Sequence, residues 1–129
     1  MNSRINITSG SPWEPVVGYS RVVKVDNHIF VSSTVATDES GTIIGVGSYY
    51  EQTKFIFRKI EKYLKEAGAT LNDIVRTRMF VVDINNWEEV GRAHAEFFKD
   101  VKPAATMVEV SRLIDDKCLI EIEVDAVIT

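Results

Sequence analysis

The strongest constraint on the fold is the alternation of apolar and charged residues near the C-terminus, from Leu119 to Ile128. Successive side chains of a β-strand point to opposite faces of the sheet, so every second residue shares a face. The apolar set is Ile120, Ile122, Val124, Ala126 and Ile128, and the opposite set is Leu119, Glu121, Glu123, Asp125 and Val127. Only the apolar face suits a helix-covered core. The segment therefore predicts a sheet with helices packed on one side.

Two segments with helical periodicity can supply that cover. Ser48 and Glu51 match a capping box, and the buried stripe that follows is Tyr49, Thr53, Ile56, Phe57, Ile60, Tyr63, Leu64 and Ala67. Phe55 lies off this stripe, so we expect it to be exposed or to meet a neighbouring subunit. A second helix is predicted after Asn85 or Asn86, with the stripe Trp87, Val90, His94, Phe97 and Phe98.

The remaining strands are predicted by runs of β-branched and apolar residues. Residues 21–25 and 28–32 form a hairpin around Asp26 and Asn27, and residues 73–83, 104–111 and 119–128 form three further strands. Residues 38–47 are rich in glycine but lack the Lys-Ser/Thr of a phosphate loop, so they predict an ordinary loop. The pattern favours an α+β fold, and 129 residues suit a single domain spanning 1–129.

Composition excludes some classes of function. The net charge is −4, and the densest run of basic residues, within 54–65, is interleaved with glutamates, which is typical of a solvated helix face. We therefore expect no nucleic-acid partner, since such a protein needs a basic stripe. No apolar run has signal-peptide or membrane-span length, so we expect a cytoplasmic protein without a membrane partner. Cys118, the single cysteine, is interpreted as a packing thiol.

The charged face of the sheet has two interpretations. Alternation places Arg76, Arg78 and Glu109 on the same face as the carboxylates of the last strand. The face is then either solvated, as in many antiparallel sheets, or an oligomer interface in which charges pair and line a ligand site. His94 is interpreted as a hydrogen-bonded core or interface histidine. No second histidine stands near it at metal-ligand spacing, so we expect no metal.

Four short stretches together resemble the Rid/YjgF family, also called the liver perchloric-acid-soluble protein family. They are Gly18-Tyr19-Ser20, Ile29-Phe30-Val31-Ser32, Glu51-Gln52-Thr53, and Pro103-Ala104 through Val108-Glu109-Val110 leading to Ile120-Glu121-Ile122-Glu123. They occur in the family's order and at similar spacing, and the resemblance covers about residues 18–127. It implies a chorismate-mutase-like fold, with a mixed sheet and two helices on one face. It also implies a homotrimer with helices outside and three clefts between subunits.

The resemblance also implies an activity. Active members of the family hydrolyse reactive enamines and imines such as 2-aminoacrylate, releasing ammonia and a 2-keto acid, and need no metal or organic cofactor. Tyr19 matches the cleft tyrosine, Glu121 the carboxylate that positions a water or a proton, and Ser32 a serine near the cleft. Ser33 stands where a glycine is usual, so the backbone there can differ or the cleft can be narrower.

A second departure concerns substrate binding. Ala105 stands where deaminases of the family have the arginine that grips the substrate carboxylate. Backbone amides near Thr106 are candidates to bind a substrate oxygen. Arg78 or Arg21 could supply the missing charge from another wall of the cleft. For Arg78, a salt bridge to Glu109 or Glu121 is an equally good explanation.

Two functions remain open from the sequence. One is a deaminase-like hydrolase that binds a small reactive metabolite and acts weakly on the usual 2-imino acids. The other is a non-catalytic trimer that binds or senses a small molecule. A third, endoribonuclease activity, is disfavoured by the acidic charge of the chain.

Overall fold

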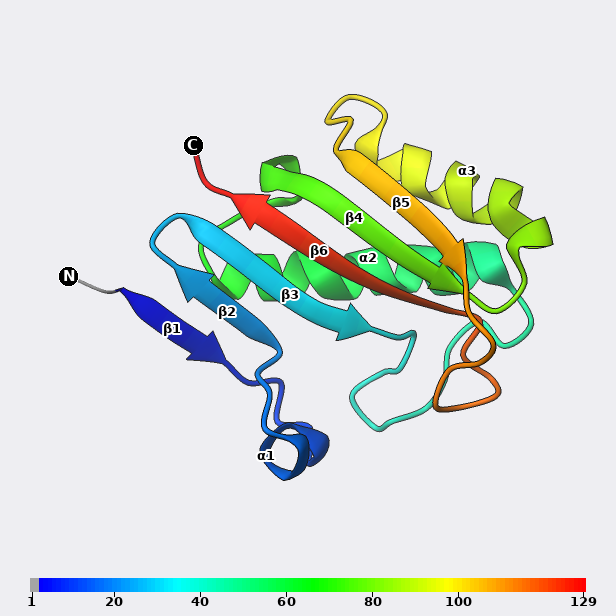
Figure 1. Ribbon diagram of the computed structural model, residues 1–129, viewed down its shortest axis with the longest axis horizontal. Coiled ribbons are helices and arrows are strands. Elements are labelled where there is room, and N and C mark those ends of the chain that lie inside the picture. The colour runs from blue at the N-terminus through cyan, green and yellow to red at the C-terminus, as the bar shows by residue number, and fades with distance from the viewer. Residues whose placement is uncertain (1–2) are drawn as a thin grey trace.

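The computed structural model describes residues 3–129, which form a single sheet with helices against it (Figure 1). The sheet has six strands in the order β1-β2-β3-β6-β4-β5. Their bounds are β1 Arg4–Ile7, β2 Val22–Val25, β3 His28–Thr34, β4 Ile74–Val81, β5 Ala104–Glu109 and β6 Ile120–Val127. The β4–β5 pair is parallel and the other neighbours are antiparallel, so the sheet is mixed, as the resemblance implied.

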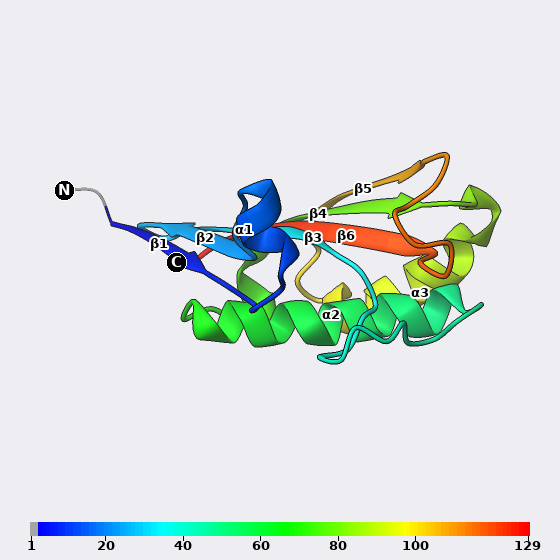
Figure 2. The ribbon, with the colours of Figure 1, turned by 90° about the horizontal axis from the view of Figure 1, so that it is seen from below.

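The two long helices, α2 Tyr49–Glu66 and α3 Trp87–Phe98, lie on one face of the sheet (Figure 2). Short 3-10 turns, η1 Leu71–Asp73 and η2 Ile84–Asn86, flank β4. A five-residue helix, α1 Trp13–Val17, connects β1 to β2 and lies toward the side of the sheet plane opposite α2 and α3 (Figure 2). Within residues 3–129, none of the helices is both long enough and apolar enough to cross a membrane.

Helix α2 follows the predicted pattern closely. Ser48 has an extended backbone, and its hydroxyl accepts a hydrogen bond from the backbone N–H of Glu51, which satisfies one free donor of the first turn. Every residue of the predicted stripe is buried. Phe55 is partly buried against the core, so the prediction that it is exposed is wrong, and contact with a neighbouring subunit stays a prediction. Gln52 is also fully buried, which the apolar pattern did not show.

Helix α3 departs from its predicted stripe at the first residue. Trp87 is 56% exposed because it is the first residue of α3, immediately after η2, while Val90 and Phe98 are buried. The side chain of Asn86 makes no capping hydrogen bond, although this residue directly precedes the helix. The rings of Phe57 and Phe98 meet edge to face with centroids 4.9 Å apart, a favourable aromatic geometry that joins α2 to α3.

The N-terminal elements β1 and α1 were not predicted. Both are short, and β1 is an edge strand whose residues are exposed or half-exposed. A buried carboxylate fixes this region: Glu14 accepts hydrogen bonds from the Thr8 hydroxyl at 2.7 Å, the Ser9 N–H at 3.2 Å and the Ser9 hydroxyl. Burial alone would raise the pKa of Glu14, but these donors and the charge of Arg21 outweigh burial and hold it below its usual value.

The sheet face opposite α2 and α3 bears the predicted charges of β6. Glu123 and Asp125 lie there, beside Arg78 and Phe30 of the neighbouring strands, and Phe30 is 46% exposed. The prediction that Glu109 lies on this charged face is wrong. Glu109 is in register with the buried Val81 and therefore belongs to the helix-covered side of the sheet. Its carboxylate accepts a hydrogen bond from the backbone N–H of Ile84 at 3.1 Å.

Candidate functional site

The candidate site is built around an irregularity at the end of β3. Val31 is paired with Val124 and Thr34 with Ile122, so β3 contains one residue more than β6 over the same stretch. Such a β-bulge bends the strand and redirects its backbone groups, and bulges are common beside functional sites. The extra residue places Ser32 and Ser33, both predicted substrate-binding residues, in the bulge.

The guanidinium of Arg21 occupies the inside of this bulge. Its Nη1 donates to the carbonyl oxygen of Ser33 at 2.7 Å and to that of Ser32 at 3.3 Å, and it also reaches the Thr34 hydroxyl at 3.3 Å. Its Nη2 lies 3.4 Å from the Tyr19 hydroxyl, and the guanidinium carbon is 5.6 Å from the centre of the tyrosine ring. Arg21 therefore connects the bulge to the predicted cleft tyrosine.

Tyr19 is positioned by the end of α1. Gly18 takes a left-handed conformation with φ of 91°, which glycine adopts without strain, and both Gly18 and Tyr19 donate backbone N–H groups to the carbonyl of Glu14. The buried Glu14 carboxylate in turn holds α1 against residues 8–9. The local sequence therefore fixes the backbone from which the Tyr19 ring projects.

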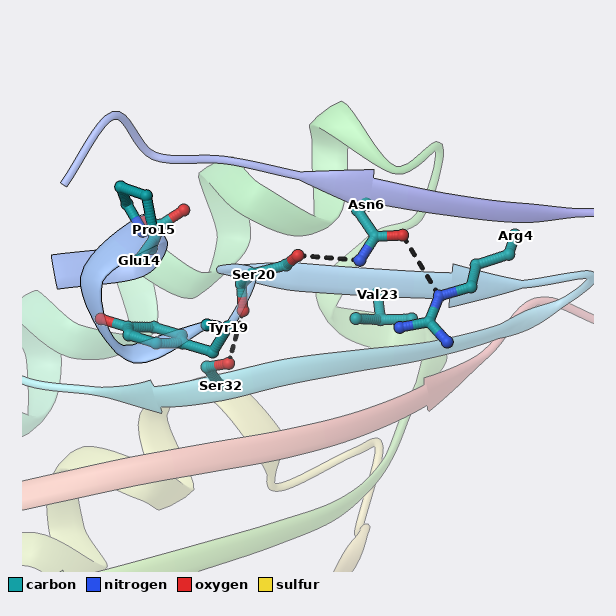
Figure 3. Close-up of a pocket in the computed structure, with 9 residues that line it drawn as sticks. Arg4, Asn6, Glu14, Pro15, Tyr19, Ser20, Val23 and Ser32 are labelled. Carbon is teal, nitrogen blue, oxygen red and sulfur yellow. Dashed lines mark hydrogen bonds between the residues drawn. The ribbon is translucent and has the colours of Figure 1, made fainter. Parts of the chain in front are cut away.

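Tyr19 and Ser32 line a hollow of about 500 Å³ on the side of the sheet that α1 occupies (Figure 3). The Ser32 hydroxyl donates to the carbonyl oxygen of Ser20 at 2.7 Å. Arg4 and Asn6 lie across the hollow and are ordered by a chain of hydrogen bonds: Arg4 Nε to Asn6 Oδ1 at 3.2 Å, and Asn6 Nδ2 to Ser20 Oγ at 2.8 Å. The hollow is polar along its edge and large enough for a small metabolite.

Glu121 lies on β6 beyond the bulge and is half-buried. Burial raises its pKa above the usual value, the charge of Arg21 opposes the rise, and Glu123 adds to it. Glu121 also lines a second hollow, of about 580 Å³, with residues 112–114 and 116 of the loop before β6. A partly buried carboxyl with a raised pKa is suited to accept and return a proton near neutral pH.

Arg78 is not free to bind a substrate within one chain. Its Nη1 lies 3.2 Å from Asp125 Oδ2 and 3.4 Å from Glu123 Oε1, across the β4–β6 pair. The alternative prediction, that Arg78 forms a salt bridge, is confirmed. Its partners are Glu123 and Asp125, so the predicted partners, Glu109 and Glu121, were wrong. Phe80, rather than Arg78, is the residue of β4 opposite Glu121.

Ala105 and Thr106 do not join this cluster within one chain. They are paired with Thr77 and Arg78 on β4, so they point to opposite faces of the sheet. Glu121 is opposite Phe80, which places Ala105 two strands away and three residues along, roughly 10 Å in the strand direction alone. Because β5 is an edge strand, its outer side is available to a second chain.

Lys59 was missed as a site residue, because its position on α2 predicts a solvated face. Its Nζ instead donates to the Thr37 hydroxyl at 2.8 Å and to the Val35 carbonyl at 3.2 Å. Burial, reinforced by the charge of Arg21, lowers the pKa of Lys59 to about 8. The sequence carries no signal for this, since the contacts depend on where the loop after β3 runs.

Two other predicted residues have structural partners. Cys118 is buried, which fits a packing thiol, and burial raises the pKa of its thiol. His94 accepts or donates a hydrogen bond at 3.0 Å with the Thr77 hydroxyl, and its ring stands edge to face with Phe57. Within residues 3–129, no three side chains of His, Cys, Asp or Glu are grouped so as to hold a metal ion.

Comparison with known proteins identifies the family. The family model described as Endoribonuclease L-PSP matches residues 9–128, nearly the whole chain. The chain belongs to the YjgF/RutC/Rid family. The resemblance in the four motif stretches is therefore confirmed, and Tyr19, Ser32 and Glu121 lie within the matched part of this Rid-family chain.

Relatives of the Rid-family chain match it over nearly all of its length. A RutC family protein of Pyrococcus abyssi is 40% identical over 124 residues, which is 95% of each chain. The 3-aminoacrylate deaminase RutC of Acinetobacter baylyi is 30% identical over 122 residues, again 95% of each chain. The crystal structure of a YjgF/YER057c/UK114 family member from Mycobacterium tuberculosis is 42% identical, with a TM-score of 0.88 over 98% of this chain and 100% of that one.

Proposed function

We propose that this Rid-family protein binds a small reactive enamine or imine in clefts between the subunits of a cytoplasmic homotrimer, and hydrolyses it. The observation that carries the proposal is the gathering of Tyr19, Glu121 and the Ser32–Ser33 bulge around Arg21 at one end of the sheet. A relative that is 30% identical over 95% of the chain is named 3-aminoacrylate deaminase, which supports this class of chemistry.

The proposed reaction needs one group that carries protons and one that orients the nitrogen. The oxygen of a water molecule bonds to the imine carbon while the Glu121 carboxylate takes a proton from the water. Glu121 then passes that proton to the nitrogen. The second proton follows the same route as the carbonyl forms, the C–N bond breaks and ammonia leaves. A hydrogen bond from Tyr19 holds the substrate in place, and the raised pKa of Glu121 suits it to this exchange.

The trimer is proposed because one chain leaves the open sheet face and the edge of β5 uncovered. Phe30 and Val108 are 46% and 40% exposed, and other copies of the chain would bury them. The same assembly would bring Ala105 and Thr106 of one subunit to the Tyr19 and Glu121 of the next, which a single chain keeps apart.

Ala105 argues against the usual 2-imino acid substrates. Replacing an arginine there removes charge-assisted hydrogen bonds worth about 1.5 to 3 kcal/mol each, and two such bonds correspond to roughly a hundredfold or more in binding. We therefore expect the chain to hydrolyse 2-iminobutanoate or 2-aminoacrylate at close to the background rate. Other enamines and imines are the better candidates.

The test supplies a panel of imines formed in situ by amino-acid and amine oxidases and follows ammonia release. The wild type should accelerate the release from at least one imine, and Glu121→Gln should lower that rate by about 10²-fold or more, since a general base contributes that much. If wild type and Glu121→Gln give equal rates with every imine while a ligand still binds, the alternative holds. The protein would then be a non-catalytic ligand-binding or sensing trimer.

Ribonuclease activity is a further candidate only because the matching family model is described as an endoribonuclease. The net charge of −4 offers few cations to neutralise phosphates. RNA binding should therefore be weak and lost at moderate salt in a filter-binding assay. Sequence-specific cleavage that persists through RNase-free purification would contradict this expectation.

A further inference from the structure

Two cations near the bulge of β3 make their hydrogen bonds within the described part of the chain to neutral oxygens alone. Arg21 donates to carbonyl and hydroxyl oxygens of residues 32–34 and to the Tyr19 hydroxyl, and Lys59 donates to the Val35 carbonyl and the Thr37 hydroxyl. Within residues 3–129, the ion pairs closer than 4 Å involve Arg58, Lys62 and Arg78 but neither of these two cations.

Among the described residues neither cation has a carboxylate in contact, although Glu14 and Glu121 are close enough for the charge of Arg21 to lower their pKa. Arg21 and Lys59 are close enough for the charge of Arg21 to lower the pKa of Lys59, so the two cations also repel each other. Glu121 feels Arg21 electrostatically but forms no ion pair with it among the described residues. A half-buried guanidinium held beside a like charge is stabilised when an anion binds to it.

Arg21 also has donors left for a ligand. A guanidinium carries five N–H donors in a rigid fork. Three hydrogen bonds converge on Nη1, and Nη2 makes one contact of 3.4 Å to the Tyr19 hydroxyl. The bulge carbonyls pin one end of the fork and so fix its orientation, which lowers the entropy lost when a ligand binds. The Tyr19 hydroxyl lies at the other end.

We propose that Arg21 receives the negatively charged group of the ligand, so that a small carboxylate is bound beside Tyr19 on the bulge side of the cleft. Lys59, on α2, adds to the positive electrostatic potential at Arg21 without contacting the ligand. The assignment rests on the proposed function, since it concerns the same cleft. The assignment is compatible with weak hydrolysis of 2-imino acids. A carboxylate bound by Arg21 would place the imine carbon at a different point in the cleft than a carboxylate bound by an arginine at position 105.

The experiment compares binding of 2-oxobutanoate, a small carboxylate, with binding of its uncharged methyl ester, by calorimetry or NMR titration. The wild type should bind the acid at least tenfold more tightly than the ester. Arg21→Gln should lose this preference, so that the variant binds the acid and the ester within about twofold of each other, because the positive charge that distinguishes them is gone. The matched control, Arg58→Gln, removes an exposed arginine on the outer face of α2 and should keep the full preference.

A second measurement on the wild type keeps the assignment testable if Arg21→Gln does not fold. Addition of 2-oxobutanoate should shift the side-chain Nε–H resonance of Arg21 and leave that of Arg58 unchanged. An unchanged Arg21 resonance at saturation, or an acid preference that survives Arg21→Gln, would overturn the role of Arg21 while leaving the binding function in place. Failure of the wild type to bind either compound would also overturn the role of Arg21, while the panel of imines would still test the proposed function.

Discussion

Gln52 gives the sharpest test of how the fold supports the site. Its side chain is fully buried, Nε2 donates to the carbonyl of Lys117 at 2.8 Å, and Oε1 accepts from the N–H of Leu119 at 2.9 Å. These two bonds clamp the segment that leads into β6 and therefore set the start of the strand that bears Glu121. The substitution Gln52→Leu keeps a similar volume and removes both bonds.

The expected cost follows from what the substitution leaves behind. An unsatisfied buried polar group costs about 1 to 3 kcal/mol, and Gln52→Leu leaves one backbone N–H and one carbonyl without their partner. Lys117 is exposed, so water can replace part of the bond to its carbonyl. We therefore expect the free energy of unfolding to fall by about 2 to 4 kcal/mol.

Urea unfolding followed by circular dichroism at a fixed protomer concentration measures this difference, since assembly makes stability depend on concentration. The matched control is Glu51→Leu, one residue earlier in the same turn and exposed, which should cost less than about 1 kcal/mol. A loss below about 1 kcal/mol for Gln52→Leu would show that the clamp does not have the role assigned to it.

Two further predictions concern pH. The folded pKa of Glu14 is lowered, so its contribution to stability is present above its ordinary value of 4.5 and is lost as the pH falls through the folded pKa. Urea unfolding should show that the wild type loses more stability on acidification than Glu14→Gln, and parallel curves would contradict this. The pKa of Lys59 is lowered to about 8 from 10.5, so the unfolded chain holds more protons between these values. The wild type should therefore gain stability relative to Lys59→Met over that pH range, and an unchanged difference would refute the burial of the amine.

Periodicity predicted the elements that bury a continuous stripe. The apolar residues recur at helical spacing in α2 and at every second position in β6, so the sequence shows which face of each element is buried. Elements β1 and α1 show no such pattern, because each is short: β1 is held by backbone pairing with β2, and α1 by hydrogen bonds from residues 8–9 to the Glu14 carboxylate. Local pattern carries no information about contacts of that kind.

The site was predictable only in part. Tyr19 and Glu121 followed from the family resemblance, whereas the place of Arg21 depends on the bulge in β3, which adds a residue without a sequence signal. Glu109 was assigned to the wrong face because alternation within a strand does not fix its register against a parallel neighbour. The partners of Arg78 were misjudged for the same reason, since they depend on how β4 aligns with β6.

The central claim is that the ligand site is completed by other copies of the chain. The native mass at micromolar concentration, measured by light scattering during size-exclusion chromatography, tests it most directly. We predict a single species of three times the 14.5 kDa chain mass, because the open face of the sheet and the edge of β5 need a partner. A species of 14.5 kDa would contradict it, since Ala105 and Thr106 would then never meet Glu121.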